Sequence, residues 1–301
     1  MAMHLNGVEI VDTFAEAFPM TAARVVVTAA SARWAMTAAT AATGYAASVI
    51  GCDTEAGIEA VLNAEQTPDG RPGVALLFFA FSRDALQKAL VNRVAQCVLT
   101  CATTAVFNGM DGDPDRSIKI GGQLRYFGDG WQISKQLDGK RYWRVPTMDG
   151  EFLCEDLFGT TKGVAGGNLI LLGDTQANTL AATEAAVDAM RKMPGVILPF
   201  PGGVVRSGSK VGSKYKALKA STNEAYCPTL RGVVKTELPD GVNAVYEIVL
   251  DGLTLQAVEA AMWAGMLAAC DCPGVNRVTA GNYGGKLGPH HIHLKKLWDG
   301  K

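Results

Sequence analysis

One pattern recurs along this sequence and limits its fold more than any other feature: an apolar strand, a helix and a second strand. In the C-terminal half the second strand twice follows a Pro-Gly-Val tripeptide. The first set comprises Asn168–Leu172, Asn178–Lys192 and Val196–Phe200, and the second comprises Ala244–Leu250, Leu255–Ala269 and Val275–Ala280. Such an internal repeat indicates duplicated supersecondary units.

The N-terminal half shows the same alternation of apolar strands with amphipathic helices. The pattern predicts strands at Ala23–Thr28, Ala46–Gly51, Val74–Phe81 and Lys119–Phe127, and helices from Ser31 to about Thr43 and from Asp84 to about Phe107. Turn signals at Gly128-Asp-Gly and Leu137-Asp-Gly predict an inserted hairpin.

Two strand-helix-strand units in each half predict an α+β chain of two ferredoxin-like lobes, each an antiparallel sheet with two helices on one face. We expect the lobes to be residues 1–150 and 151–301, since 301 residues suffice for two cores. A doubly wound nucleotide-binding fold is the competing prediction. It needs longer unbroken alternation of parallel strands and helices than this sequence shows.

The charge composition excludes a general electrostatic attraction to nucleic acid or to an anionic membrane. Lys and Arg number 28 against 29 Asp and Glu, so a charged ligand must be bound locally. Hydrophobic residues make up 48% of the chain and charged residues 19%. This apolar composition predicts a multimer that buries surface beyond the core.

The cysteines and the N-terminus both indicate a reducing, cytoplasmic location. The 7 cysteines are odd in number and lie among apolar residues, as reduced core residues do. The first residues carry acidic groups where a signal peptide carries basic ones, and no stretch approaches the roughly 18 apolar residues of a membrane span. We therefore expect no disulfide framework and no membrane attachment.

A long insertion, Pro201–Asp240, separates two strands of the C-terminal half. It exceeds the roughly 12–15 residues beyond which a structureless connection is usually either functional or disordered. Its cations are Arg206, Lys210, Lys214, Lys216 and Lys219. The insertion is either the place where an anionic ligand binds or a solvated basic loop, and the sequence supports both equally.

Two sets of residues suggest metal ligands, and both have a simpler interpretation. His291 and His293 in His-His-Ile-His would share one strand face, but strand-end histidines without a third ligand type nearby explain them better. Cys97 and Cys101 lie on the apolar stripe of a predicted helix, which favours a reduced core pair. The sequence therefore predicts no metal site.

Three glycine-rich segments suggest phosphate or dinucleotide loops without matching them. Gly203–Lys210 places its lysine after a serine, whereas a Walker A loop needs Gly-Lys-Ser/Thr. Gly163–Asn168 and Gly281–Lys286 lack the dinucleotide fingerprint, although such glycines let backbone amides approach a ligand. Tight turns at strand ends explain them equally well. No serine lies in a nucleophile elbow.

Glu247 is the strongest candidate for acid–base chemistry. In the predicted strand it shares a face with Val245 and Val249, while the other face is wholly apolar. If this face lines a partly closed cleft, desolvation raises the pKa of the carboxyl group and allows proton transfer near neutral pH. A polar residue on an exposed sheet face is the alternative.

Seven segments spread along the chain form a combination that is more specific than any single motif. They are NGVEIVDTFAEAF (Asn6–Phe18), TPDGRPGV (Thr67–Val74), GVAGGN (Gly163–Asn168), PFPGGVVRSGSKVGSK (Pro199–Lys214), STNEAYCPT (Ser221–Thr229), VYEIVLDGL (Val245–Leu253) and AGNYGGKLG (Ala280–Gly288). Together these segments resemble the family of formylmethanofuran:tetrahydromethanopterin formyltransferases, and the resemblance runs from end to end.

The resemblance implies two ferredoxin-like lobes, a cytoplasmic homotetramer and reversible transfer of a formyl group between methanofuran and the ring amine of tetrahydromethanopterin. The two carriers are substrates, and no tightly bound cofactor or metal is expected. The family's catalytic glutamate falls on Glu247. The candidate substrate-binding residues are Gly202, Gly203, Arg206, Ser207, Lys210, Lys214, Ser221, Asn223, Tyr226, Gly284, Gly285 and Lys286.

The balanced charge, −1 at pH 7, is more similar to relatives in methylotrophic bacteria than to the strongly acidic archaeal ones. In the bacteria the family serves formaldehyde oxidation, as the formyltransferase subunit of a formyltransferase/hydrolase complex. Two alternatives remain. The chain is a non-catalytic subunit that binds one carrier and organises partner enzymes, or it is a formyltransferase that uses tetrahydrofolate.

Overall fold

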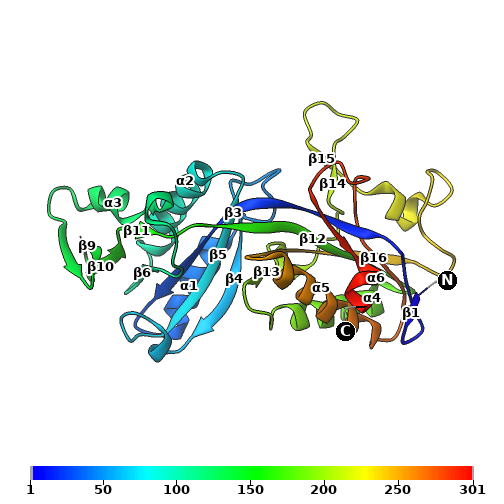
Figure 1. Ribbon diagram of the computed structural model, residues 1–301, viewed down its shortest axis with the longest axis horizontal. Coiled ribbons are helices and arrows are strands. Elements are labelled where there is room, and N and C mark those ends of the chain that lie inside the picture. The colour runs from blue at the N-terminus through cyan, green and yellow to red at the C-terminus, as the bar shows by residue number, and fades with distance from the viewer. Residues whose placement is uncertain (1–2, 300–301) are drawn as a thin grey trace. The chain divides into compact units, whose positions relative to one another are not determined.

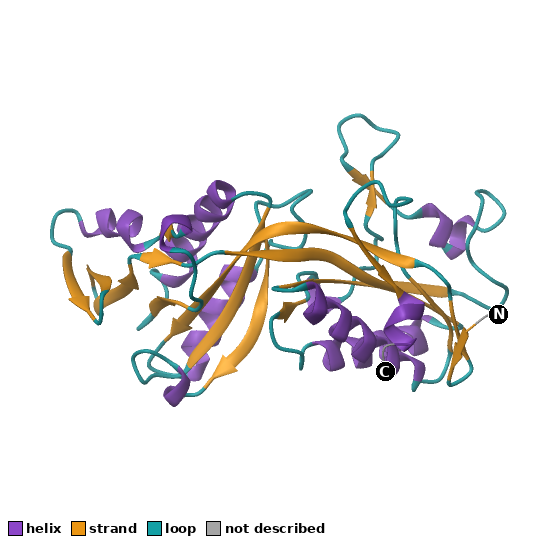
Figure 2. Cartoon of the chain, in the orientation of Figure 1, coloured by secondary structure: helices purple, strands orange, loops and turns teal. Residues whose placement is uncertain are grey.

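The computed structural model describes residues 3–299 (Figures 1 and 2). The chain forms two compact units: unit 1 comprises Met1–Pro19 and Val164–Lys301, and unit 2 comprises Met20–Gly163. Residues 1–2 of the first expected lobe and residues 300–301 of the second lie outside the described part of the chain. The units together give a mixed α/β fold.

Unit 2 is built on a four-stranded antiparallel sheet with strand order β6-β3-β5-β4. The elements follow one another as β3 (Phe14–Thr28), α1 (Ala32–Thr43), β4 (Glu55–Leu62), β5 (Gly73–Ala80), α2 (Arg83–Arg93) and β6 (Ala105–Asn108), and β3 enters the unit at Met20. The two helices bury alanine and leucine side chains against the sheet, and these side chains recur at the three- and four-residue spacing of a helix face.

The rest of unit 2 is the predicted hairpin and its neighbours. It contains β7 (Ile118–Lys119), α3 (Gly121–Leu124), β8 (Ile133–Leu137), β9 (Lys140–Thr147), β10 (Gly150–Glu155) and β11 (Leu157–Phe158). β8, β9 and β10 pair antiparallel, and β10 joins β6 in parallel. The turn between β8 and β9 lies at Asp138 and Gly139, both with positive φ, which confirms the hairpin.

Unit 1 repeats this plan with the strand order β17-β12-β16-β13. Its elements are β12 (Thr161–Gly173), α4 (Gln176–Met190), β13 (Val196–Ile197), β16 (Ala244–Gly252), α5 (Leu255–Cys270) and β17 (Val275–Thr279). Thr175 and Thr254 cap α4 and α5, since each hydroxyl accepts from a backbone N–H in the first turn. The two helices lie side by side (Figure 1) and cover the sheet face that carries Ile248 and Leu250.

The chain ends and the insertion complete unit 1. β1 (Met3–Leu5), β2 (Val8–Ile10), β18 (His290–His293) and α6 (Leu294–Asp299) come from the ends, and β14 (Lys210–Val211) and β15 (Ala220–Ser221) from the insertion. β2 pairs with β17, and β18 pairs with the first residues of β3. Because of these pairings the N-terminal strands belong to the unit made by the second half, so the compact units differ from a division at residue 150.

Three predicted elements of unit 2 are wrong. The strand expected at residues 46–51 is a turn, and the second strand is β4. The Arg93 guanidinium donates to the backbone carbonyls of Ala42, Gly44 and Tyr45, at the end of α1 and just before residues 46–51. These hydrogen bonds hold the chain in a turn where the strand was expected to begin.

The helix expected to reach residue 107 ends far earlier. α2 stops at Arg93, a π-helical turn covers Val94–Val98, and Ala105–Asn108 is β6. Thr104 ends the helical segment, since its hydroxyl donates to the carbonyl of Val98 at 2.6 Å. The strand expected at residues 119–127 is mostly helical, because only the first residue continues β7 before α3 begins.

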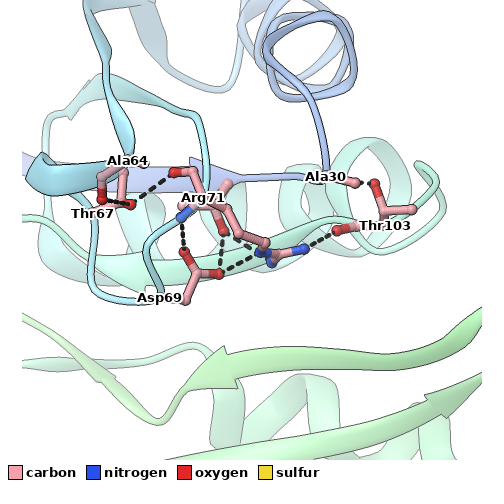
Figure 3. Close-up of polar contacts among 7 residues, drawn as sticks. Ala30, Ala64, Thr67, Asp69, Arg71 and Thr103 are labelled. Atoms are coloured by element: carbon pink, nitrogen blue, oxygen red, sulfur yellow. Dashed lines mark hydrogen bonds and ion pairs between the residues drawn. The ribbon is translucent and has the colours of Figure 1, made fainter.

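The segment of unit 2 that matches TPDGRPGV is an ordered loop whose polar groups bind one another (Figure 3). Arg71 donates to Asp69 at 2.7 Å, to Thr28 at 3.0 Å and to the carbonyl of Thr103 at 2.6 Å. Asp69 also accepts from the Thr28 hydroxyl at 2.7 Å. The side chains of this motif therefore stabilise the loop itself.

No helix within residues 3–299 is long and apolar enough to cross a membrane.

Candidate functional site

Glu247 lies in the middle of β16, with a strand pairing on each side. Ile170 of β12 is its neighbour on one side. On the other side Val205 forms an isolated antiparallel bridge, and the two residues exchange backbone hydrogen bonds of 2.7 and 3.0 Å. The first part of the insertion therefore runs beside β16. The Glu247 side chain points to the sheet face opposite α4 and α5, as the alternation along the strand requires.

The Glu247 carboxyl group is buried, with 4% of the residue exposed, and only one of its oxygens is paired. Oε1 accepts a 2.5 Å hydrogen bond from the Ser209 hydroxyl. Oε2 has no hydrogen-bond partner within residues 3–299. Burial raises the pKa of Glu247 from 4.5 to about 7, although hydrogen bonds from Ser209 oppose the shift. This carboxyl group is therefore suited to take up and release a proton near neutral pH.

The carboxyl group lies in a small pocket that is partly open to solvent. The lining combines apolar side chains, hydrogen-bond donors and one thiol: Ile170, Val205, Arg206, Ser207, Gly208, Asn223, Tyr226, Cys227, Val245 and Glu247. The pocket brings together five of the residues expected from the sequence: Arg206, Ser207, Asn223, Tyr226 and Glu247. All of them belong to unit 1.

The lysines of the insertion do not line this pocket. Lys210 forms an ion pair of 2.5 Å with Glu224, which lowers the pKa of that glutamate. Lys214 is exposed in the loop between β14 and β15. Ser221 supports this hairpin, because its hydroxyl donates to the carbonyl of Gly212 at 2.7 Å. These residues shape the insertion next to the pocket.

Gly202 and Gly203 also lie outside the pocket lining, at the start of the insertion. They form a short 3-10 turn, Pro201–Gly203, and both have positive φ. Gly203 is buried, and a Cβ atom there would lie 2.9 Å from a methyl carbon of Val187. Glycine at this point lets the chain turn tightly against α4.

Gly284, Gly285 and Lys286 lie in loop 280–288, which folds around a carboxylate that the sequence did not single out. Glu16 is 3% exposed and accepts hydrogen bonds from the backbone N–H groups of Tyr283, Gly285, Leu287 and Gly288. Burial raises the pKa of Glu16, but the four N–H donors outweigh it and the net shift is downward. Glu16 therefore remains ionised and holds the loop.

Sequence reasoning also missed Ser209, Cys227 and Tyr283. Ser209 and Cys227 lie inside segments that carried the resemblance. Neither residue is charged, and neither belongs to a motif whose spacing indicates chemistry. For Glu16 a signal was present, since it is a single acidic residue within the apolar segment Phe-Ala-Glu-Ala-Phe, as Glu247 is within its own strand.

The histidine segment forms a strand, β18, so His291 and His293 lie on one strand face. The ring of Phe14 lies 4.7 Å from that of His291 and 5.3 Å from that of His293, centroid to centroid. Within the described residues no group of three or more His, Cys, Asp and Glu side chains is placed to hold a metal ion.

Two family models match the chain. A model described as formylmethanofuran-tetrahydromethanopterin formyltransferase matches residues 3–147, and one described as the proximal lobe of FTR matches residues 150–297. A relative from Methylobacillus flagellatus with the name formylmethanofuran--tetrahydromethanopterin formyltransferase is 59% identical, over 98% of this chain and 99% of its own.

Two solved structures resemble the fold closely. One is the formyltransferase/hydrolase complex from Methylorubrum extorquens with methylofuran, at 52% identity, a TM-score of 0.95 and coverage of 99% of both chains. The other is the formylmethanofuran:tetrahydromethanopterin formyltransferase from Methanosarcina barkeri, at 50% identity, a TM-score of 0.92 and coverage of 98% of this chain and 100% of the other. On these matches, the chain belongs to the formylmethanofuran-tetrahydromethanopterin formyltransferase family.

Proposed function

We propose that this chain transfers a formyl group reversibly between formylmethanofuran, or a methanofuran-type analogue, and the ring amine of tetrahydromethanopterin. The observation that carries the proposal is the buried, half-paired carboxyl group of Glu247 in a pocket of unit 1. Membership of the formyltransferase family supplies the reaction. The two carriers act as substrates, and the proposed chemistry requires no tightly bound cofactor.

The proposed role of Glu247 is to move one proton during the transfer. The attacking amine forms a bond to the formyl carbon and gives a tetrahedral intermediate, and Glu247 accepts the proton that this amine loses. The carboxyl group then returns the proton to the departing nitrogen as the old carbon–nitrogen bond breaks. A carboxyl group with a pKa near 7 performs both steps at neutral pH.

The remaining pocket residues would bind and orient the substrates. Arg206, Ser207 and Asn223 provide hydrogen-bond donors in the lining, which suits a carbonyl oxygen that becomes negative during the reaction. Tyr226 provides an aromatic ring next to Glu247. We assign Gly202, Gly203, Lys210, Lys214, Ser221, Gly284, Gly285 and Lys286 to the shape and charge of the pocket surroundings.

The direct test is to incubate the purified protein with formylmethanofuran and tetrahydromethanopterin and to measure the formylated pterin. Tetrahydrofolate in a parallel assay tests the folate-dependent alternative. We expect formylation of tetrahydromethanopterin and little or none of tetrahydrofolate. Preference for tetrahydrofolate would assign the alternative enzyme. No turnover with either pterin, together with binding of one carrier, would assign a non-catalytic subunit.

We propose further that the chain serves formaldehyde oxidation in a methylotroph, within a formyltransferase/hydrolase complex in the cytoplasm. The similarity to the Methylobacillus relative and to the complex from Methylorubrum extorquens supports this proposal. In such a complex the formyl group passes from the pterin to the methanofuran-type carrier and is then released as formate. Copurification of the chain with hydrolase subunits would support it.

Each unit is proposed to be a ferredoxin-like lobe. The support is the order of elements in both units, strand-helix-strand twice, together with the strand order 4-1-3-2 in each sheet. In unit 2 this order is β6-β3-β5-β4, and in unit 1 it is β17-β12-β16-β13. Superposition of the two units tests this proposal.

The chain is also proposed to form a homotetramer. β8 is an edge strand that pairs with β9 on one side and, within residues 3–299, with no strand on the other. Large apolar side chains are exposed on it and just before it: Tyr126, Phe127, Trp131, Ile133 and Leu137. Such an edge favours pairing with a second copy. Light scattering at moderate salt should give a multimer that Ile133→Glu weakens, and a monomeric wild type would contradict the proposal.

A further inference from the structure

We propose that Tyr283 and Glu16 are positioning residues that hold the Ser209 hydroxyl on the Glu247 carboxyl group. This inference deepens the function proposed above and rests on it. The contacts form one continuous series within unit 1: Glu16 folds loop 280–288, the loop carries Tyr283, and Tyr283 binds the backbone on both sides of Lys210. Ser209 then binds Glu247.

The loop is fixed from several directions. Four backbone N–H groups converge on the Glu16 carboxylate, with Tyr283 at 2.7 Å and Gly288 at 2.8 Å. Asn168 binds the backbone of Gly281 twice, because its side chain accepts from the N–H at 2.6 Å and donates to the carbonyl at 3.1 Å. A carboxylate bound by four donors has little freedom. The loop backbone therefore presents Tyr283 in one place.

The Tyr283 hydroxyl makes two hydrogen bonds to the insertion. It donates to the carbonyl of Ser209 at 2.7 Å and accepts from the N–H of Val211 at 2.9 Å. These are the backbone groups next to the hydroxyl that binds Glu247. The segment would otherwise rely on the Val205 bridge and the short β14–β15 pairing. Tyr283 therefore fixes the position and orientation of the Ser209 side chain relative to the Glu247 carboxyl group.

The consequence for chemistry lies in the charge state of Glu247. Hydrogen bonds from Ser209 stabilise the ionised form of this carboxyl group and counteract the effect of burial. If the Ser209 segment moves away, the pKa of Glu247 rises further and the base is lost at neutral pH. The titratable and charged groups near Glu247 are Arg206, Tyr226 and Cys227 in the pocket lining, and Tyr283 of loop 280–288. Burial raises the pKa of Tyr226 and of Tyr283, and the charge of Glu247 adds to both shifts. Glu237 and Arg277 also act on Tyr226.

The test uses Tyr283→Phe, which keeps the ring and removes only the hydroxyl. The matched control is Tyr215→Phe. Tyr215 belongs to the insertion that Tyr283 contacts, and it is 73% exposed. The readout is the titration of Glu247 by NMR in the full chain labelled with ¹³C at glutamate carboxyl groups, with Glu247→Gln to assign the signal. This measurement does not depend on formyl transfer, so it succeeds or fails separately from the proposed function.

We expect Tyr283→Phe to move the Glu247 titration to higher pH and Ser209→Ala to move it in the same direction. In the double variant, Glu247 should titrate as it does in Ser209→Ala, because both substitutions remove the same contact, that of the Ser209 hydroxyl with Glu247. In the active enzyme the acid limb of kcat/KM should move with the NMR midpoint, and kcat at pH 7 should fall several-fold. Tyr215→Phe should change neither.

An unchanged Glu247 titration in folded Tyr283→Phe would overturn the proposal. An additive effect of the double variant would also overturn it, because Tyr283 and Ser209 would then act independently. Glu16→Gln should give the same shift as Tyr283→Phe. If Glu16→Gln does not fold, Tyr283→Phe and the double variant still decide the question.

Discussion

Unit 1 buries two glutamates on its strands, and the groups around them differ. Glu16 accepts four backbone hydrogen bonds, and its pKa is lowered. Glu247 has one hydroxyl partner on Oε1 and none on Oε2 among residues 3–299, and its pKa is raised to about 7. Burial is common to both, so the number of donors decides which carboxyl group remains ionised and which can exchange a proton.

The largest expected effect is on turnover when Glu247 loses its titration. Glu247→Gln keeps the shape and the hydrogen bond from Ser209 but cannot carry the proton. A positioned acid–base group contributes about 10²–10⁴-fold, so kcat should fall by that factor while the fold persists. Circular dichroism and light scattering provide the control for folding. Near-normal turnover of the folded variant would make Glu247 structural, and the two glutamates would then share one role.

The second prediction compares the pH dependence of stability in wild type and Glu247→Gln. Because the folded-state pKa is about 7 and the ordinary value 4.5, the folded chain binds more protons than the unfolded chain between these pH values. The contribution of Glu247 to the free energy of unfolding is therefore complete below pH 4.5 and is lost as pH rises through about 7. The shift of its pKa from 4.5 to about 7 corresponds to roughly 3 kcal/mol of this free energy. Urea denaturation at several pH values measures it, and parallel curves for both proteins would contradict the assignment.

The sequence predicted most of unit 1 and less of unit 2. In unit 1 the elements α4, β13, β16, α5 and β17 lie within a few residues of their predicted positions. β12 begins at Thr161 rather than at Asn168, and β1, β2 and α6 were not predicted. In unit 2 one error arose where a long-range group overrode local preference, since Arg93 binds three carbonyls at and just after the end of α1. Such contacts leave no periodic trace in the sequence.

The candidate site was predictable where chemistry lay in one residue. Glu247 stood out as a carboxyl group in an apolar strand, and the pocket around it includes Arg206 and Asn223 as expected. Glu16, Ser209 and Tyr283 depend on contacts between segments far apart in the chain. The ion pair of Lys210 with Glu224 likewise joins groups within the folded insertion that no sequence pattern connects.

The third prediction concerns the fully paired glutamate. Glu16→Gln removes the charge that four N–H groups bind, so the free energy of unfolding should fall by roughly 2 kcal/mol at pH 7. The difference should disappear as pH falls through the lowered pKa of Glu16, because a protonated carboxyl group no longer provides the anion. Chemical denaturation at pH 7 and at a series of lower pH values measures both effects. If wild type and Glu16→Gln have equal free energies of unfolding at pH 7, the negative charge of Glu16 does not stabilise the loop.

The smallest expected effect is at Lys214, an exposed lysine of the insertion. Lys214→Ala should raise KM for the anionic carriers by no more than about fivefold and leave kcat unchanged, since exposed charges are screened. Lys192→Ala, at an exposed lysine after α4, is the matched control. The difference between the two variants should vanish at high salt. A fall in kcat for Lys214→Ala would place this lysine in the chemical step, together with Glu247.

The measurement that tests the role of Glu247 most directly is the pH dependence of kcat/KM for wild type and Glu247→Gln. This quantity reports the ionisations of the free enzyme. With Glu247 as the base, kcat/KM of the wild type should rise with pH through a limb centred near pH 7, the pKa of Glu247. In Glu247→Gln the limb should be absent. If the same limb persists unchanged in the variant, the proton belongs to another group, even if the variant is slow.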